Sequence, residues 1–120
     1  MSHIGYTSTL SIIKIIPYTT RKGAQPFPDW QAKLDKPIQA IVVARLVRVR
    51  LGNFGDCKLL QNSDGVWELR INHGPGYRVY FGKQGLTIII LLIGGDKKSQ
   101  TRDIAKAKQY WLEYKESEND

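Results

Sequence analysis

The stretch Val66–Gly82, VWELRINHGPGYRVYFG, decides the fold that this sequence predicts. Apolar and polar residues alternate on both sides of its centre, and this period of two is typical of β-strands, whose successive side chains point to opposite faces. The centre itself contains asparagine, proline and glycine around Gly74, a composition that favours a turn. We therefore expect a β-hairpin with one apolar face and one polar face.

The polar face of this predicted hairpin carries four reactive side chains: Glu68, Arg70, Arg78 and Tyr80. If the hairpin closes symmetrically about Gly74, Arg70 lies opposite Arg78. The same register places Glu68 opposite Tyr80. Two opposed arginines destabilise an exposed strand pair by about 0.2–1 kcal/mol, and a phosphate, which fits the planar fork of arginine, would remove that penalty. We expect the polar face to point away from the core, either to hold such an anion or to let Arg and Glu neutralise one another in solvent.

The composition describes one domain with a basic surface. A chain of 120 residues is long enough for one hydrophobic core and too short for two, so we expect a single domain over residues 1–120. Its 18 Lys and Arg residues against 11 Asp and Glu residues give a net charge of +7, which favours an acidic partner such as nucleic acid or an acidic protein. The one cysteine, Cys57, permits no disulfide within the chain, so we expect a reducing, cytoplasmic location.

Several classes of protein are not supported by the sequence. The longest apolar run, Leu86–Ile93, is far shorter than the ~20 residues that span a bilayer. The first residues lack a basic stretch followed by an apolar one, so we expect no export signal there. The two histidines, His3 and His73, lie far apart and offer no metal-ligand spacing with Cys57. A glycine-rich phosphate loop is also absent. We therefore expect no membrane partner, no metal site and no small-molecule cofactor.

The rest of the chain shows alternating strand and helix patterns. The first half of the chain predicts a strand over 11–18, a helix over 29–35 capped by Asp29, and a longer helix from Pro37 to about 52. A strand over 58–61 and the two hairpin strands follow. The last predicted elements are a central strand over 86–93, apolar on both faces, and a helix from Ser99 or Thr101 to Glu116. Their sum is an α+β domain consisting of a strand, two helices, a mainly antiparallel strand meander and a C-terminal helix, with the helices against one face of the sheet. Residues 1–10 are expected to form a loosely held N-terminus, and residues 116–120 a frayed C-terminus.

The predicted helix over 37–52 carries apolar residues on two sides. One stripe fits helical spacing and predicts the face that packs on the sheet: Ile38, Ile41, Val42, Leu46 and Val49. A second stripe consists of Ala40, Val43, Ala44, Val47 and Leu51. This second stripe either is buried in the ordinary way or presents an apolar strip to a partner protein. The segment Leu46–Leu51 also alternates like a strand, so its pattern alone does not choose between helix and strand.

Five strings of residues have counterparts in one known superfamily. They are YTTRKGAQPFPDW, RLVRVRLGNFGD, GVWELRI, GPGYRVYF and LLIGGDKKSQTRDIAKA. Through them the chain, from about Ile12 to Trp111, resembles the RelE/ParE superfamily of toxin proteins, and most of all its HigB-like branch of addiction-module killer proteins. The resemblance implies a small RelE-like domain and favours helix for residues 37–51.

The resemblance also implies a function. Proteins of the HigB-like branch are toxins of type II toxin–antitoxin modules. The resemblance implies a metal-independent endoribonuclease, or mRNA interferase, that cuts mRNA in the decoding site of the ribosome and arrests translation. The implied partners are the ribosome with its mRNA and a cognate antitoxin, of the helix-turn-helix type, that neutralises the toxin. The ParE side of the superfamily instead inhibits DNA gyrase without catalysis, and a third alternative is an inactive relative; the fold alone does not separate these functions.

The resemblance assigns roles to three basic residues. Arg78, in the GYR motif, matches the arginine that contacts the scissile phosphate. Arg70 falls where RelE has a lysine on the preceding strand, and Lys97, in GGDK, matches a basic residue proposed to protonate the leaving oxygen. RNA cleavage needs charge stabilisation at the phosphorane and an acid for the 5′-oxygen. We therefore expect Arg70 and Arg78 to hold the non-bridging oxygens and Lys97 to act as the acid.

The base that removes the 2′-proton is left open. Glu68 occupies a strand position where RelE has another lysine, and either Glu68 or Tyr80 is a candidate base. His73, in the turn beside them, is a third candidate, although a loop histidine is more often only solvated. Five further basic residues are expected to grip ribosomal RNA: Lys98, Arg102, Arg45, Arg48 and Arg50. For the last three of these the alternative is a solvated helix face.

Overall fold

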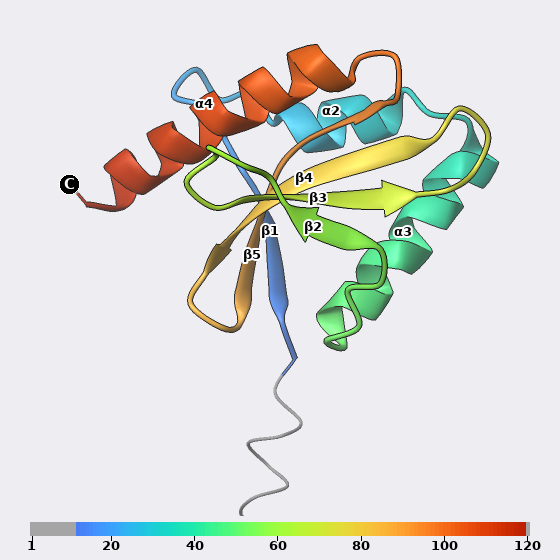
Figure 1. Cartoon of the computed structure of the whole chain (residues 1–120), viewed down its shortest axis with the longest axis horizontal. Coiled ribbons are helices and arrows are strands. Elements are labelled where there is room, and N and C mark those ends of the chain that lie inside the picture. The colour runs from blue at the N-terminus through green and yellow to red at the C-terminus, as the bar shows by residue number, and fades with distance from the viewer. Residues whose placement is uncertain (1–11, 120) are drawn as a thin grey trace, which may run out of the picture.

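The structure is a computed structural model that describes residues 12–119 (Figure 1). Its elements are β1 (Lys14–Pro17), α2 (Pro26–Ala32), α3 (Lys36–Arg50), β2 (Cys57–Leu59), β3 (Val66–Ile71), β4 (Tyr77–Gln84), β5 (Ile88–Asp96) and α4 (Gln100–Glu118). This order confirms the predicted strand, two helices, strand meander and C-terminal helix. The predicted loose N-terminus, residues 1–10, lies outside the described residues.

Five strands form one sheet in the order β1-β5-β4-β3-β2. β1 runs parallel to β5, and the other neighbours are antiparallel, in agreement with the predicted mainly antiparallel meander. Pro17 is the last residue of β1, an edge strand, where a proline without an N–H group is tolerated. β5 lies between β1 and β4 and is buried from Ile89 to Gly95, which confirms the prediction of a central strand covered on both faces.

The hairpin of β3 and β4 has the predicted register. Arg70 pairs with Arg78, and Glu68 pairs with Tyr80. The turn between the strands contains Gly74, with a φ angle of 54°. Glycine adopts such a positive φ angle without the steric penalty that a Cβ brings, so the hairpin can close tightly at this point. The two arginines therefore lie side by side at the turn end of the sheet.

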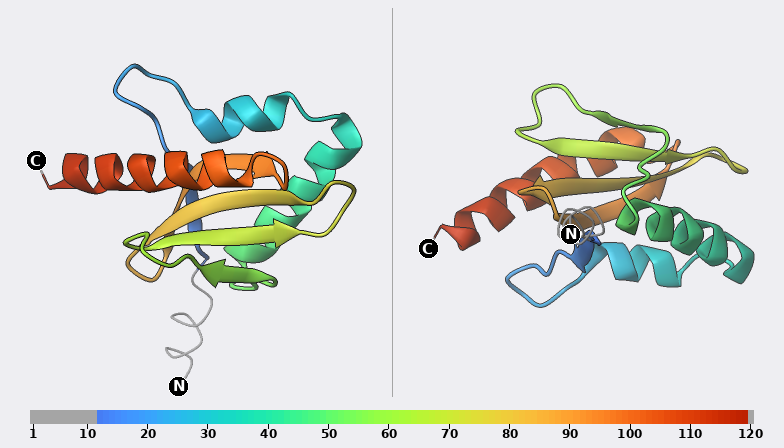
Figure 2. Two further views of the ribbon diagram at one scale, coloured as in Figure 1. Left: turned by 45° about the horizontal axis from the view of Figure 1, so that its top comes forward. Right: turned by 90° about the horizontal axis from the view of Figure 1, so that it is seen from below.

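The helices cover both faces of the sheet, which corrects the prediction that they share one face. The right panel of Figure 2 shows α4 on one side of the sheet and α2 and α3 on the other. Two glycines permit this close cover. A Cβ at Gly94 would run into the ring of Trp30 on α2, and a Cβ at Gly82 would run into the ring of Trp111 on α4. Because β5 is apolar on both faces, each face needs a helix to exclude water.

Several helix ends differ from the prediction, and α2 ends at Ala32 rather than at residue 35. α2 begins at Pro26 rather than after Asp29, since a proline in the first helical turn lacks only an N–H group that would have no partner there. α4 begins after Ser99, as predicted, but continues to Glu118 instead of fraying from Glu116. No helix in the described range is long and apolar enough to cross a membrane.

α3 is helical through the ambiguous segment that ends at Arg50, and it separates the two apolar stripes. The inner stripe packs against the sheet, where Val42 and Val49 are buried. The outer stripe is exposed: Val43, Val47 and Leu51 have exposed fractions of 48%, 45% and 72%. Ordinary burial of the second stripe, one of the two alternatives, is therefore wrong for these residues.

Candidate active site at the β3–β4 turn

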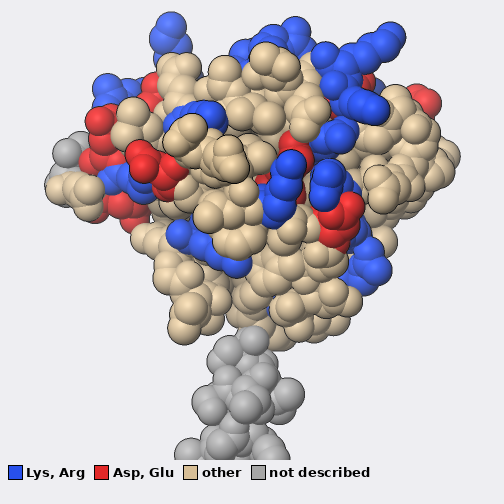
Figure 3. Space-filling view, in the orientation of Figure 1, with Lys and Arg blue, Asp and Glu red and all other residues tan. Residues whose placement is uncertain are grey.

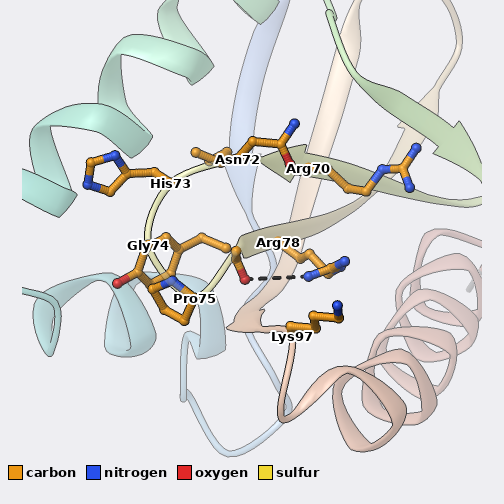
Figure 4. Close-up of a pocket in the computed structure, with 10 residues that line it drawn as sticks. Arg70, Asn72, His73, Gly74, Pro75, Arg78 and Lys97 are labelled. Carbon is orange, nitrogen blue, oxygen red and sulfur yellow. Dashed lines mark hydrogen bonds between the residues drawn. The ribbon is translucent and has the colours of Figure 1, made fainter.

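An open cavity of about 370 Å³ lies at the turn between β3 and β4. Its lining consists of Arg70, Ile71, Asn72, His73, Gly74, Pro75, Gly76, Tyr77, Arg78 and Lys97. Three of these residues are cations, and each comes from a different strand end: Arg70 from β3, Arg78 from β4, and Lys97 from the position after β5. Figure 4 shows the three side chains projecting to the same side of the turn. Three positive charges thus border one space.

The strand register brings Lys97 to the cavity. Tyr77 pairs with Asp96, so the residue after β5 lies directly beside the start of β4. The Asp96 carboxylate accepts a hydrogen bond from the backbone N–H of Ser99 at 3.1 Å, and the Ser99 hydroxyl accepts one from the backbone N–H of Asp96 at 3.2 Å. These two bonds fix the short loop between β5 and α4. Lys97 is therefore held at the rim by its backbone, while the residue itself stays exposed.

Arg78 forms an ion pair with a buried carboxylate, that of Glu68. The Arg78 side chain is only 14% exposed, and its Nε lies 3.6 Å from Oε2 of Glu68, whose side chain has an exposed fraction of 0%. Arg78 Nη1 donates to the backbone carbonyl oxygen of Gly76 at 3.4 Å. The same Glu68 oxygen accepts hydrogen bonds from the hydroxyl of Tyr80 at 3.2 Å and from the amide of Gln100 at 2.8 Å. The carboxylate is thus fixed by the neighbouring strand and by α4, and it supplies a stationary negative charge behind the guanidinium.

Glu68 and Tyr80 do not face away from the core, contrary to the prediction. α4 covers this part of the sheet, and both residues have exposed fractions of 0%. Burial raises the pKa of the Tyr80 hydroxyl, and the charge of Glu68 and the hydrogen bond to it raise that pKa further. Neither residue lines the cavity, so neither is placed to take a proton from a ligand there. The alternation of a strand defines two faces but does not show which face a helix will cover.

Arg70 is paired with a carboxylate of the loop before β2. Its Nη2 and Nε lie 3.0 and 3.3 Å from Oδ1 of Asp56. Both side chains are partly exposed, 37% for Arg70 and 43% for Asp56, so solvent screens the pair. A phosphate bound in the cavity would compete with Asp56 for the guanidinium.

Arg45 holds that loop in place from the interior. Only 7% of the residue is exposed. Its guanidinium donates to the backbone carbonyl oxygens of Phe54, Asp56 and Arg70 at 2.7, 3.3 and 3.2 Å. A Cβ at Gly55, whose φ angle is 64°, would lie 2.9 Å from Arg45 Nη2, so the loop approaches the guanidinium where there is no side chain. Arg45 therefore does not lie on a solvated helix face, which corrects that alternative. It lines part of an open groove of about 720 Å³, and its contact with RNA stays a prediction.

The chemistry available at the cavity is that of an anion site. Its lining contains three cations and no carboxylate. Within residues 12–119, no group of three or more His, Cys, Asp or Glu residues comes together in a way that would hold a metal ion. Arginine can bind a phosphate through two parallel hydrogen bonds, and an ammonium group can donate a proton. The site can therefore hold a phosphodiester and protonate an oxygen that leaves it.

Comparison with known proteins places the chain in a family. Residues 29–111 match the family described as phage derived protein Gp49-like (DUF891). The chain belongs to this Gp49-like family. A relative from Haemophilus influenzae, described as an uncharacterized protein, is 47% identical over 88 residues, which are 72% of this chain and 87% of that protein. The Gp49-like family is associated with toxins of toxin–antitoxin systems, which implies a cognate antitoxin as partner.

His73 lines the cavity of this Gp49-like protein but is turned away from the basic side chains. Figure 4 shows its ring pointing away from the side where Arg78 and Lys97 lie. The residue is exposed in the turn. Of the predicted catalytic set, the structure therefore gathers Arg70, Arg78 and Lys97 at the cavity and leaves His73 at its edge.

The other basic residues predicted to bind RNA lie mostly in two hollows beside the cavity. Arg48 lines a groove of about 720 Å³ that shares Arg70 with the cavity. Lys98 and Arg102 line a hollow of about 520 Å³ at the start of α4. Arg50 is exposed at the end of α3, beside β1, and lines neither hollow. Figure 3 shows basic side chains spread over the face that it displays, with acidic side chains among them.

Sequence reasoning missed three residues of the site in this Gp49-like protein: Asp56, Asn72 and Gln100. Asn72 directly follows β3, so its place beside Arg70 could have been inferred from the predicted turn. Asp56 lies in an irregular loop that has no repeating pattern. The contact of Gln100 with Glu68 joins residues 32 positions apart and depends on α4 crossing the sheet, which no local pattern indicates.

Proposed function

We propose that this Gp49-like protein is the toxin of a type II toxin–antitoxin module and that it cleaves mRNA on the ribosome. In this proposal it is an endoribonuclease, and a cognate antitoxin neutralises it. The observation that carries the proposal is the convergence of Arg70, Arg78 and Lys97 on one open cavity whose lining has no carboxylate. A protein that only bound to another enzyme would not need this arrangement. The association of the family with toxins and the resemblance to RelE support the same function.

In the proposed reaction, the 2′-oxygen of a ribose attacks the adjacent phosphorus. A bond forms between the 2′-oxygen and phosphorus, the bond to the 5′-oxygen breaks, and the products are a cyclic phosphate and a 5′-hydroxyl. Arg78 binds one non-bridging oxygen, and this interaction strengthens as negative charge develops in the transition state. Arg70 binds the other non-bridging oxygen after it separates from Asp56. Lys97 gives a proton to the leaving 5′-oxygen.

The 2′-proton needs an acceptor. In the proposal, the buried candidates for this role are excluded. Glu68 and Tyr80 lie under α4. His73 is the remaining candidate of the turn, and it can act only if its exposed ring rotates toward the cavity. In the proposal Glu68 is instead the fixed counter-charge that directs Arg78 toward the phosphate.

The test maps cleavage sites on a reporter mRNA during translation. Purified protein is added to a translating extract, and the 5′ ends of the mRNA are mapped by primer extension beside the same RNA without ribosomes. We expect cuts in frame with the codons, and only where ribosomes are present. Arg78→Ala should lower the rate by a few hundredfold, which corresponds to the ~3 kcal/mol that one oxyanion-binding group contributes.

Arg21→Ala is the matched control, since Arg21 is an exposed arginine in the loop between β1 and α2. It should cleave like the wild type. Equal cleavage by Arg78→Ala and the wild type would end the catalytic proposal. Intact mRNA in the presence of folded protein would favour the ParE-like alternative or an inactive toxin relative, and a DNA gyrase supercoiling assay would separate those two.

A further inference from the structure

α3 carries an exposed apolar strip on the side that faces away from the sheet. We call this surface the α3 strip and define it as Ala40, Val43, Ala44, Val47 and Leu51. Val43, Val47 and Leu51 follow one another at intervals of four residues, so their side chains lie in a row along the helix. Their exposed fractions are 48%, 45% and 72%. A continuous apolar row of this kind is typical of a surface that another molecule covers.

The α3 strip is bordered by positive charge. The helix from Lys36 to Arg50 contains no acidic residue, although its N-cap is Asp35. Its exposed basic residues are Lys36, Arg48 and Arg50. None of these three forms an ion pair within residues 12–119. A molecule that covers the strip can therefore gain further binding energy if it brings acidic groups to its borders.

A second copy of this chain does not meet that condition. In a symmetric pair the same surface faces itself, so the basic residues beside one strip would approach those beside the other. Like charges placed against one another across an interface oppose association. The charges around the strip therefore favour a different protein with negative potential.

We propose that the α3 strip is the docking surface for an amphipathic helix of a partner protein. The bound helix has apolar residues at intervals of three and four along one face and acidic residues along both borders of that face. This inference rests on the proposed function for the identity of the partner, which is the protein that neutralises the toxin. What is new is the surface of this chain on which the partner binds and the chemical character of the partner's binding segment.

Docking at the α3 strip also reaches the candidate active site. Ala44 belongs to the strip and lines the groove of about 720 Å³ that continues to Arg70. Arg48, at the border of the strip, lines the same groove. An acidic side chain paired with Arg48 therefore lies where an RNA phosphate would enter the groove. The partner lowers the affinity for RNA in this way without contact with Arg78.

The test uses two designed helical peptides of about four turns each. Both have the same leucine face, and one has glutamate and the other lysine at the border positions. Binding of each labelled peptide to the full chain carrying Lys97→Gln, a change at an exposed residue, is measured by fluorescence anisotropy. We expect the glutamate peptide to bind and the lysine peptide to remain free at the same concentrations, and added salt should weaken the glutamate complex.

Matched variants locate the binding surface. Val47→Gln places an amide in the middle of the strip and should weaken binding of the glutamate peptide by about tenfold or more. Leu112→Gln is the control, because Leu112 is 51% exposed on α4 and its change should leave binding as it was. Arg48→Gln should reduce both the salt dependence of binding and the displacement of a labelled RNA oligonucleotide by the peptide.

Equal binding of the two peptides, no binding of the glutamate peptide, or equal losses in Val47→Gln and Leu112→Gln would overturn the proposal. A concentration-dependent dimer in sedimentation experiments that Val47→Gln abolishes would overturn it in favour of a second copy. Since the protein carries Lys97→Gln, which removes the proposed acid, none of these outcomes depends on cleavage. If the cleavage assay failed but the glutamate peptide bound specifically, the proposed nuclease activity would be rejected. The proposed docking surface would be retained.

Discussion

Glu68 shows how one buried residue sets the direction of another. Its Oε2 accepts hydrogen bonds from Tyr80 and Gln100, and it lies 3.6 Å from Nε of Arg78. Neither Arg78 Nε nor Glu68 Oε1 has a hydrogen-bond partner within residues 12–119, so the pair interacts through charge. Desolvation offsets most of the attraction within a buried ion pair. The effect of Glu68 is therefore larger on the position of the guanidinium than on net stability.

Removal of one partner from this buried pair is expected to be costly. Glu68→Ala leaves Arg78 without its counter-charge and should lower the free energy of unfolding by about 3–5 kcal/mol. Gln100→Ala removes one hydrogen bond to the carboxylate and should lower it by about 1.5–3 kcal/mol. Urea unfolding followed by circular dichroism measures both changes. Glu116→Ala, at an exposed position of α4, is the control. If Glu68→Ala lowered the free energy of unfolding no more than Glu116→Ala does, the buried pair would be contradicted.

Tyr18 should make stability fall in alkaline solution. Its hydroxyl donates to Glu113 at 3.0 Å. Burial, followed by this hydrogen bond and the charge of Glu113, raises the pKa of Tyr18 from 10.0 to about 12. The unfolded chain loses the proton at a lower pH than the folded chain, so the contribution of Tyr18 is complete below pH 10 and is lost as the pH rises from 10 to 12. Unfolding free energies across this range should decline less steeply in Tyr18→Phe, and parallel curves for the two proteins would contradict the assignment.

At the scale of elements, Arg45 joins α3 to the loop before β2 and thereby to Arg70. Arg45→Met keeps the length of the side chain but leaves three carbonyl oxygens without their donor. We expect a loss of stability on the order of 3 kcal/mol, together with faster amide hydrogen exchange in residues 54–56. Arg48→Met, on the exposed side of the same helix, should change neither quantity appreciably. Similar results for the two variants would show that Arg45 does not support the loop.

The sequence predicted the elements that depend on local pattern. The alternation on both sides of Gly74 predicted the β3–β4 register, and the apolar run of β5 predicted a central strand. The cover of α4 was not predictable in the same way, because it depends on the space that Gly82 leaves for Trp111, and these residues are distant in the chain. Glu68 and Tyr80 were misplaced for that reason.

The burial of Arg45 was indicated by helical spacing, but its residue type pointed to a solvated side chain. Arg45 lies three positions after Val42 and four before Val49, so helical spacing places it in the buried stripe of α3. Its charge suggested a solvated side chain instead. The predicted cations of the cavity were easier to locate, because Arg70 and Arg78 are paired by the hairpin and Lys97 follows the strand beside them.

At the scale of the whole molecule, the net charge of +7 predicts binding to RNA that weakens with salt. Six basic residues line the cavity and the hollows beside it with exposed or partly exposed side chains: Arg48, Arg70, Arg78, Lys97, Lys98 and Arg102. Each phosphate contact with single-stranded RNA contributes about −0.7 to the slope of log affinity against log salt, so six contacts predict a slope of about −4. Fluorescence anisotropy with a labelled oligonucleotide measures it. Lys98→Gln should reduce the slope by about 0.7, whereas Arg50→Gln should leave it unchanged; a slope near zero would exclude this mode of binding.

The pairing of β1 with β5 determines how early during synthesis the sheet of this protein can be completed. β1 is translated before α2, α3 and three further strands, and its neighbour β5 follows all of them. The edge of the sheet therefore cannot form until most of the chain has left the exit tunnel. Gln100, which helps to fix the carboxylate behind Arg78, emerges later still. Under the proposed function, the ribosome that makes this toxin is protected from it until Lys97 and Gln100 have left the exit tunnel.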